Sequence, residues 1–194
     1  DWITQGPRVA EFEERFAAYT GARYAVAVSN CTTALHLSMI MAGVGAGDEV
    51  ICPSMSYIAT ANCIKYVGAK PVFAEVNPDT YNLDITDAEQ KITSKTKAIL
   101  LVHQIGMPAD IDAFQLLAAK YNLKLIEDAA CAAGSSYKGK KIGSHSELVC
   151  FSLHPRKVIS TGDGGFVTTN REDYYQRLKL LRQHGMSVND RVRH

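Results

Sequence analysis

One lysine, Lys157, stands in a setting that could give its side chain chemistry. The apolar run at residues 148–151 ends at Ser152, and Pro155 then prevents an easy continuation of extended structure. A glycine-rich patch at residues 162–165 follows and lets backbone approach a ligand closely. A lysine on such an irregular turn is a candidate Schiff-base nucleophile if its surroundings lower its pKa. A single loop lysine is more commonly a surface residue, so this hypothesis depends on the rest of the chain.

Two further groups stand where predicted strands end. Residues 29–33 end one strand and open a helix, so free backbone N–H groups and the positive helix end favour a phosphate, with the Thr32 hydroxyl as a further donor. Asp128 ends another apolar strand, and a carboxylate that projects from there into a cleft needs a partner, such as a protonated pyridine nitrogen. Taken alone, the first segment could be an ordinary N-cap, and Asp128 could be a helix cap or half of a salt bridge.

A phosphate seat, a pyridinium partner and a Schiff-base lysine are together what pyridoxal 5'-phosphate (PLP) requires of a protein. Tyr57 could cover one face of the PLP ring, since aromatic stacking suits a flat cofactor. For Tyr57 alone, a core tyrosine is the competing interpretation. The combination predicts a PLP site built from separate parts of the chain.

The elements that must position these residues alternate along the sequence. Helical spacing predicts helices at residues 8–19, 32–41, 58–67, 85–92, 111–121 and 172–183. Apolar runs predict strands at residues 24–28, 49–52, 71–76, 97–103, 123–128, 148–151 and 166–169, with a small hairpin at 137–142. This alternation predicts an α/β fold, in which a mostly parallel sheet carries helices on both faces. Ligands of such sheets bind at the carboxyl ends of the strands.

Composition argues against several classes of protein. The 194 residues suit one domain with a sizeable core, and a net charge of +1 without a basic run makes nucleic acid and anionic membranes poor partners. No apolar run approaches the roughly 20 residues of a membrane span. The cysteines form no CxxC pair and no metal-ligand spacing, so we predict no metal site and mostly buried, reduced thiols in a cytoplasmic protein. They are Cys31, Cys52, Cys63, Cys131 and Cys150.

The chain resembles the DegT/DnrJ/EryC1/StrS family of PLP-dependent sugar aminotransferases over residues 2–185. The segments that carry the resemblance are residues 2–7, 47–51, 57–62, 127–130, 137–143 and 151–165. Each segment is weak alone, but the ordered set is specific. The resemblance implies a fold type I architecture, with a three-layer large domain like that of aspartate aminotransferase.

The resemblance also assigns roles to individual residues. Lys157 would carry the cofactor as a Schiff base and later move protons, and Asp128 would pair with the pyridine nitrogen. His154 belongs to the same motif but is assigned no chemical step. The other cofactor contacts would come from Cys31 through its backbone, Thr32, Tyr57 and Ser152.

Three positions depart from the family pattern. Cys31 stands where glycine is usual before the phosphate-binding threonine, and its Cβ would crowd the backbone there. Cys131 replaces a glutamine near the phenolic oxygen of the cofactor, and a thiol is a far weaker hydrogen-bonding group. Ala133 stands where histidine is common. These positions bear on the tuning of the cofactor and on sugar preference.

The activity that the resemblance implies is transfer of an amino group from an amino acid, with L-glutamate expected, to a keto group of a nucleotide-linked sugar by a homodimer. It also implies that residues 1–194 are the PLP-binding large domain of a longer protein, without the partner-reaching Gly-x-Asn-x-Arg segment and the smaller C-terminal domain. Two alternatives stay open. One is a catalytically inactive PLP-fold regulatory or assembly protein, and the other is a sugar dehydratase, which carries histidine at the position of Lys157.

Overall fold

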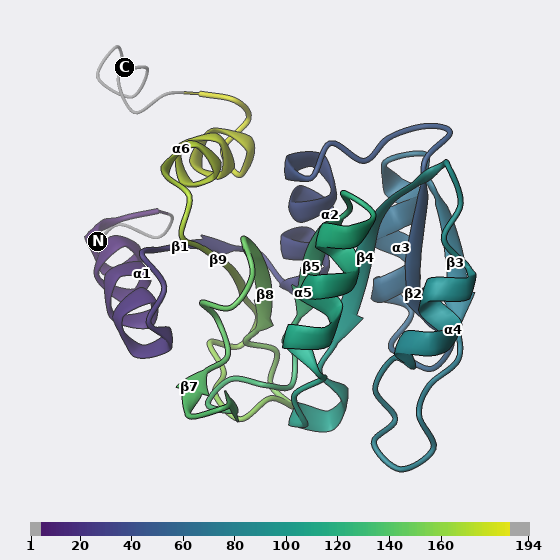
Figure 1. Ribbon diagram of the computed structural model, residues 1–194. Helices are drawn as coiled ribbons and strands as arrows, with labels where there is room; N and C mark the ends of the chain where they lie inside the picture. The colour runs from purple at the N-terminus through teal and green to yellow at the C-terminus, as the bar shows by residue number, and fades with distance from the viewer. Residues whose placement is uncertain (1–4, 187–194) are drawn as a thin grey trace.

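Strands and helices alternate along the chain as predicted, in a computed structural model that describes residues 5–186 (Figure 1). Residues 2–4 of the first resembling segment lie outside the described residues. The helices are α1 (Pro7–Thr20), α2 (Cys31–Met41), α3 (Ala59–Tyr66), α4 (Ile85–Gln90), the 3-10 helix η1 (Gln104–Gly106), α5 (Ile111–Lys120) and α6 (Glu172–Leu181). The strands are β1 (Tyr24–Val28), β2 (Glu49–Pro53), β3 (Lys70–Ala74), β4 (Thr96–Val102), β5 (Lys124–Asp128), β6 (Ser136–Tyr137), β7 (Lys140–Lys141), β8 (Leu148–Ser152) and β9 (Gly165–Thr169).

Seven strands form one sheet in the order β1-β9-β8-β5-β4-β2-β3. Pairing is parallel from β8 through β5, β4 and β2 to β3, whereas β9 runs antiparallel to both β1 and β8. Parallel neighbours need long crossover connections. Helices α3, α4 and α5 lie in the connections from β2 to β5, whereas the segment with the β6–β7 hairpin joins β5 to β8. The predicted hairpin is present as β6 and β7. The prediction of a mostly parallel sheet is therefore confirmed.

Each strand contributes to two cores, because successive side chains of a strand point to opposite faces. In β4, Ala98 and Leu100 pack with residues of α2, α3 and α6, while Ile99 and Leu101 pack with residues of α1, α4 and α5. Helix α5 lies on the near side of the sheet in Figure 1. Both faces of the sheet are thus covered by helices, which explains why β4 is an almost continuous apolar run.

The carboxyl ends of β1, β2, β4, β5 and β8 lie at one edge of the sheet, because these five strands run in the same direction. Asp128 is paired in register with Val102 of β4 and Cys150 of β8. The loops that follow these strand ends carry the residues predicted to do chemistry. Within residues 5–186, none of the helices combines the length and apolar character needed to cross a bilayer.

The antiparallel strand β9 begins against the start of α2. A Cβ atom on Gly165 would lie 2.5 Å from the carbonyl carbon of Asn30 and 2.7 Å from the backbone nitrogen of Cys31, closer than real Cβ contacts. A glycine at this position therefore lets the first turn of α2 approach the sheet edge.

We expect Gly165→Ala to push the first turn of α2 away from the sheet and to lower the free energy of unfolding by about 1–3 kcal/mol, as overpacking does. Urea unfolding measures this loss. Gly45→Ala is the matched control, since a Cβ there would meet no atom within 4 Å. Equal stability of the two variants would show that this close approach is not a constraint.

Candidate active site

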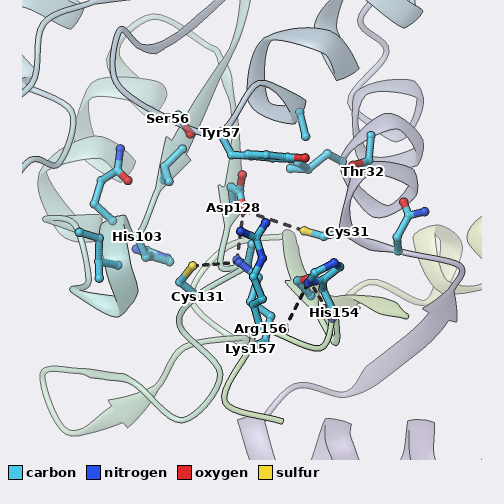
Figure 2. A pocket seen from close by; sticks show the side chains of 18 of the residues that line it. Cys31, Thr32, Ser56, Tyr57, His103, Asp128, Cys131, His154, Arg156 and Lys157 are labelled. Carbon is cyan, nitrogen blue, oxygen red and sulfur yellow. Dashed lines mark hydrogen bonds between the residues drawn. The ribbon is translucent and has the colours of Figure 1, made fainter. Parts of the chain in front are cut away.

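A cavity of about 280 Å³ opens at the carboxyl edge of the sheet (Figure 2). Its walls come from the loops that follow the parallel strands. All the predicted site residues line it: Cys31, Thr32, Tyr57, Asp128, Ser152 and Lys157. Segments far apart in the sequence are thus brought together, as the strand-end argument predicted.

The start of α2 forms one wall of the cavity. The Asn30 side chain caps this helix, because its Oδ1 accepts hydrogen bonds from the Thr33 backbone N–H at 2.9 Å and from the Thr33 hydroxyl at 3.1 Å. The N–H groups of Cys31 and Thr32 belong to the first turn and have no acceptor within the helix. With the Thr32 side chain also in the wall, this end of α2 suits an anion such as a phosphate.

Asp128 lies at the cavity floor and is 5% exposed. Its Oδ1 accepts a hydrogen bond from the Ala130 N–H at 3.1 Å, and its Oδ2 accepts one from the Thr60 hydroxyl at 3.2 Å. Among residues 5–186, no lysine, arginine or histidine forms an ion pair with Asp128, and Asp128 caps no helix there. The two alternatives for this carboxylate therefore do not apply to the described part of the chain.

Burial raises the pKa of the Asp128 carboxyl above its ordinary value, because the charged form loses hydration. The Ala130 N–H, the Thr60 hydroxyl and nearby positive charge, including that of Lys157, offset part of this effect. A buried carboxylate in this state is stabilised by an added cation at hydrogen-bonding distance. The protonated ring nitrogen of PLP is such a cation, so the cavity floor fits that cofactor.

Cys31 places its thiol beside this carboxylate. Its Sγ lies 4.0 Å from Asp128 Oδ1, and the side chain is buried (Figure 2). Burial, followed by the charge of Asp128, raises the pKa of the Cys31 thiol well above its ordinary value, so the thiol stays protonated. Cys31, which stands where the family pattern has glycine, thus adds a neutral thiol next to Asp128.

Lys157 sits on a turn whose ends are fixed by backbone hydrogen bonds. The Lys157 N–H donates to the His154 carbonyl at 2.9 Å, and the Leu153 N–H donates to the Gly164 carbonyl at 2.8 Å, which closes the loop. The Lys157 Nζ donates to Cys131 Sγ at 3.1 Å across the cavity (Figure 2). Lys157 is therefore half-buried in the cavity wall. Its amine contacts Cys131, which stands where the family pattern has glutamine.

Tyr57 and Ser152 complete the predicted set. Tyr57 is 71% exposed, which excludes a core tyrosine, and Figure 2 shows its ring edge-on above Asp128. Ser152 is buried, and its Oγ accepts a hydrogen bond from the His154 N–H at 3.3 Å. The hydroxyl hydrogen of Ser152 stays available for an anion in the cavity.

A buried pair was missed by sequence reasoning: His103, which lines the cavity, and Glu127 behind it. His103 Nε2 lies 2.9 Å from Glu127 Oε2, with both side chains 0% exposed. The Ala109 N–H donates to His103 Nδ1 at 3.1 Å, so Nε2 carries the proton and donates it to the carboxylate. The backbone N–H of His103 also donates to the Asp128 carbonyl at 3.0 Å. This bond and the side-chain pair together link the ends of β4 and β5. A histidine directly after an apolar strand was the available signal.

The thiols mostly follow the prediction. All five cysteines are free, and Cys131 is exposed while the other four are buried. Within residues 5–186, no group of three or more histidine, cysteine, aspartate or glutamate side chains could hold a metal ion.

Comparison with known proteins agrees with this geometry. The profile of the DegT/DnrJ/EryC1/StrS aminotransferase family matches residues 1–194. The GDP-perosamine synthase of Caulobacter vibrioides is 47% identical over 191 residues, which are 98% of this chain and 52% of that protein. S. venezuelae DesV, solved in complex with a ketimine intermediate, superposes with a TM-score of 0.91 at 42% identity, over 93% of this chain and 49% of that one. The PLP form of Spr1654 from Streptococcus pneumoniae, described as a sugar aminotransferase, gives a TM-score of 0.92 at 34% identity, over 96% and 53%.

The chain spans about half the length of the curated relatives it matches. Its fold is the α/β arrangement of these aminotransferase structures, as the resemblance implied. The profile match covers every strand of the sheet and every wall of the cavity. The chain therefore belongs to the DegT/DnrJ/EryC1/StrS aminotransferase family.

Proposed function

We propose that residues 1–194 are the PLP-binding large domain of a homodimeric, cytoplasmic aminotransferase. The enzyme transfers an amino group from an amino acid, L-glutamate, to a keto group of a nucleotide-linked sugar. The observation that carries this proposal is one cavity in which the Lys157 amine, the buried Asp128 carboxyl and an anion-binding helix end lie together. The relatives named for GDP-perosamine synthesis and sugar amino transfer support the sugar substrate, and the five free thiols support the cytoplasm.

The residues that would hold PLP surround the cavity. The N–H groups of Cys31 and Thr32, with the hydroxyls of Thr32 and Ser152, would bind its phosphate. Tyr57 would cover one face of the ring, and Asp128 would accept the hydrogen bond of the ring nitrogen. When bound, PLP supplies an electron sink for the carbon that carries the amino group.

Two residues of the chain, Lys157 and Asp128, would take part directly in the reaction. The Lys157 amine would hold the cofactor covalently at rest. Once the amine of the substrate has displaced it, the Lys157 amine would accept the proton of the substrate α-carbon as a general base and donate it again as a general acid. Beside that ring, Asp128 would stay ionised and would keep the proton on the ring nitrogen. Tyr57 limits the access of water to that face.

Lys157 also separates this proposal from its alternatives. A dehydratase of the same fold has histidine at this position, and histidine offers no primary amine for a covalent link. A non-catalytic protein would have no requirement to keep six chemically matched side chains around one cavity.

Apolar side chains near the cavity support the homodimer. Ile105 in η1 is 82% exposed, and its φ of 54° is strained for a β-branched residue. Other exposed apolar side chains stand on the segments that follow β2, β4 and β8, namely Met55, Tyr57, Ile58, Met107, Val158 and Ile159. These exposed side chains beside the cavity, called the apolar patch below, suit contact with a second copy of the chain around a two-fold axis.

Lys157 should be the site of covalent attachment. We expect PLP to give a visible absorbance band with the full-length protein, and borohydride to fix a pyridoxyl group on Lys157, as peptide mapping would report. Lys157→Ala should bind PLP without a covalent link and lose transamination almost completely. The exposed Lys140 serves as the control, since Lys140→Ala should keep the band. A pyridoxyl group on another lysine, or on none, would overturn the assignment.

Asp128→Asn should have opposite effects on activity and on stability. Turnover should fall by several powers of ten, because a neutral amide holds the ring-nitrogen proton weakly. A loss of less than tenfold, about 1.4 kcal/mol of barrier, would contradict the pairing.

Without cofactor, the Asp128→Asn variant should be more stable than wild type near neutral pH. The folded pKa of Asp128 is raised, so its contribution to stability is present at acidic pH and is lost as the pH rises through that pKa. Thermal unfolding of both apo proteins across pH 3–8 measures the difference, which should vanish at the acidic end.

The full-length protein should sediment as a dimer, and Ile105→Asp should shift it toward monomer by placing a charge in the apolar patch. Leu116→Asp is the control, because Leu116 is 74% exposed on α5 and should tolerate the charge. Sedimentation equilibrium distinguishes these cases. A wild-type monomer that transaminates would disprove the dimer.

A further inference from the structure

Thr60 is a buried hydroxyl that none of the assigned roles explains. It lies in the first turn of α3 and is 2% exposed. Its Oγ1 lies 3.2 Å from Asp128 Oδ2 and 2.7 Å from Ser56 Oγ. A buried hydroxyl destabilises a fold unless it is hydrogen-bonded, and Thr60 is bonded on both sides. Both of its partners belong to the cavity wall.

The direction of these two hydrogen bonds follows from the chemistry of the carboxylate. An ionised Asp128 can only accept, so Thr60 must donate its hydrogen to Oδ2. The oxygen of Thr60 then accepts the hydrogen of Ser56, which fixes a chain that runs from Ser56 through Thr60 to Asp128. Donors in such a chain polarise one another and strengthen the final bond.

Thr60 and Ala130 together fix the plane of the carboxyl group. The Ala130 N–H holds Oδ1 from the loop after β5, while Thr60 holds Oδ2 from α3. Each oxygen has a second lone pair, so both remain able to accept a hydrogen bond from the cavity. Two donors on separate elements prevent the side chain from rotating about its last bond.

The same chain reaches the loop that carries the aromatic wall. Ser56 directly precedes Tyr57, and both line the cavity (Figure 2). The side-chain amide of Gln104 donates to the Met55 carbonyl of this loop. The position of the Tyr57 segment and the orientation of Asp128 are therefore coupled through two hydroxyl groups.

We propose that Thr60 is a positioning residue, which orients Asp128 toward the ring nitrogen of the cofactor and links that carboxylate to the Tyr57 loop through Ser56. The inference rests on the proposed function for the role of Asp128. The hydrogen bonds from Ser56 to Thr60 and from Thr60 to Asp128, however, are present in the protein without cofactor. Other titratable groups face Asp128 from the surrounding elements. They are Cys31 of α2, Cys63 of α3, Cys150 of β8, His103 after β4 and Lys157 after β8.

Thr60→Val tests the proposal, because valine keeps the shape of threonine and removes the hydroxyl. Hydrogen bonds to charged groups are among the stronger ones in proteins, so the loss of this one should lower PLP affinity and kcat about tenfold or more each. The KM of the amino donor should change little. Thr60→Ser should restore both to within about threefold of wild type. Thr20→Val is the matched control, since Thr20 is also 2% exposed and its hydroxyl bonds backbone carbonyls of α1, away from the cavity. If Thr60→Val binds PLP as wild type does, or if serine fails to rescue it, the proposal is wrong.

A second measurement needs no cofactor. The carbon-13 shift of the Asp128 carboxyl, followed by NMR against pH, should show a higher pKa in Thr60→Val than in wild type, because the lost hydroxyl stabilised the ionised form. Thr60→Ser should return the pKa toward wild type and Thr20→Val should not move it. An unchanged pKa in Thr60→Val would overturn the hydrogen-bond chain, whereas failure of wild type to bind PLP would overturn only the proposed function.

Discussion

A carboxyl group buried at the end of a central strand is the constraint on which the cavity depends. Removing the Asp128 carboxylate from water is unfavourable, and within the described residues no ion pair compensates it. Its position is maintained by two hydrogen bonds and by the packing of β5 between β4 and β8. A site of this kind is most stable when a cation lies beside the carboxylate, so the same burial that weakens the empty fold favours a positively charged group in the cavity.

The sheet supplies the rigidity that this arrangement needs. Because both faces of β4 and β5 are covered by helices, neither strand can shift without disturbing two cores. The His103–Glu127 pair adds a hydrogen-bonded link between the ends of these strands. The cavity residues therefore stand on fixed strand ends, while the loops that carry Tyr57 and Lys157 close the sides.

The sequence was informative where local pattern and topology agree. Asp128, Ser152 and the residues before Thr32 all follow apolar runs, so the rule that parallel strands present ligand sites at their carboxyl ends was sufficient to place them together. Other features depend on tertiary contacts that no local pattern encodes. The contact between Cys31 and Asp128 joins residues 97 positions apart, and the bond from Thr60 to Asp128 joins residues 68 apart. The insertion of the antiparallel β9 between β1 and β8 was likewise not predictable, because strand order is decided by which faces and edges can be buried together.

The position of β9 has a consequence for how the chain reaches its native state during synthesis. The first strand, β1, forms its ladder with β9, and the Arg23 N–H beside it bonds the side chain of Asn170, 147 residues later. On the ribosome, β2, β3, β4 and β5 can pair with one another as they emerge, but β1 has no partner in the described sheet until β9 has been made. The helix that follows β1, α2, forms one wall of the cavity, so this wall takes its final position only after β9 has been made. Long-range pairing of this kind slows folding and prolongs the exposure of an apolar strand such as β1 on the nascent chain.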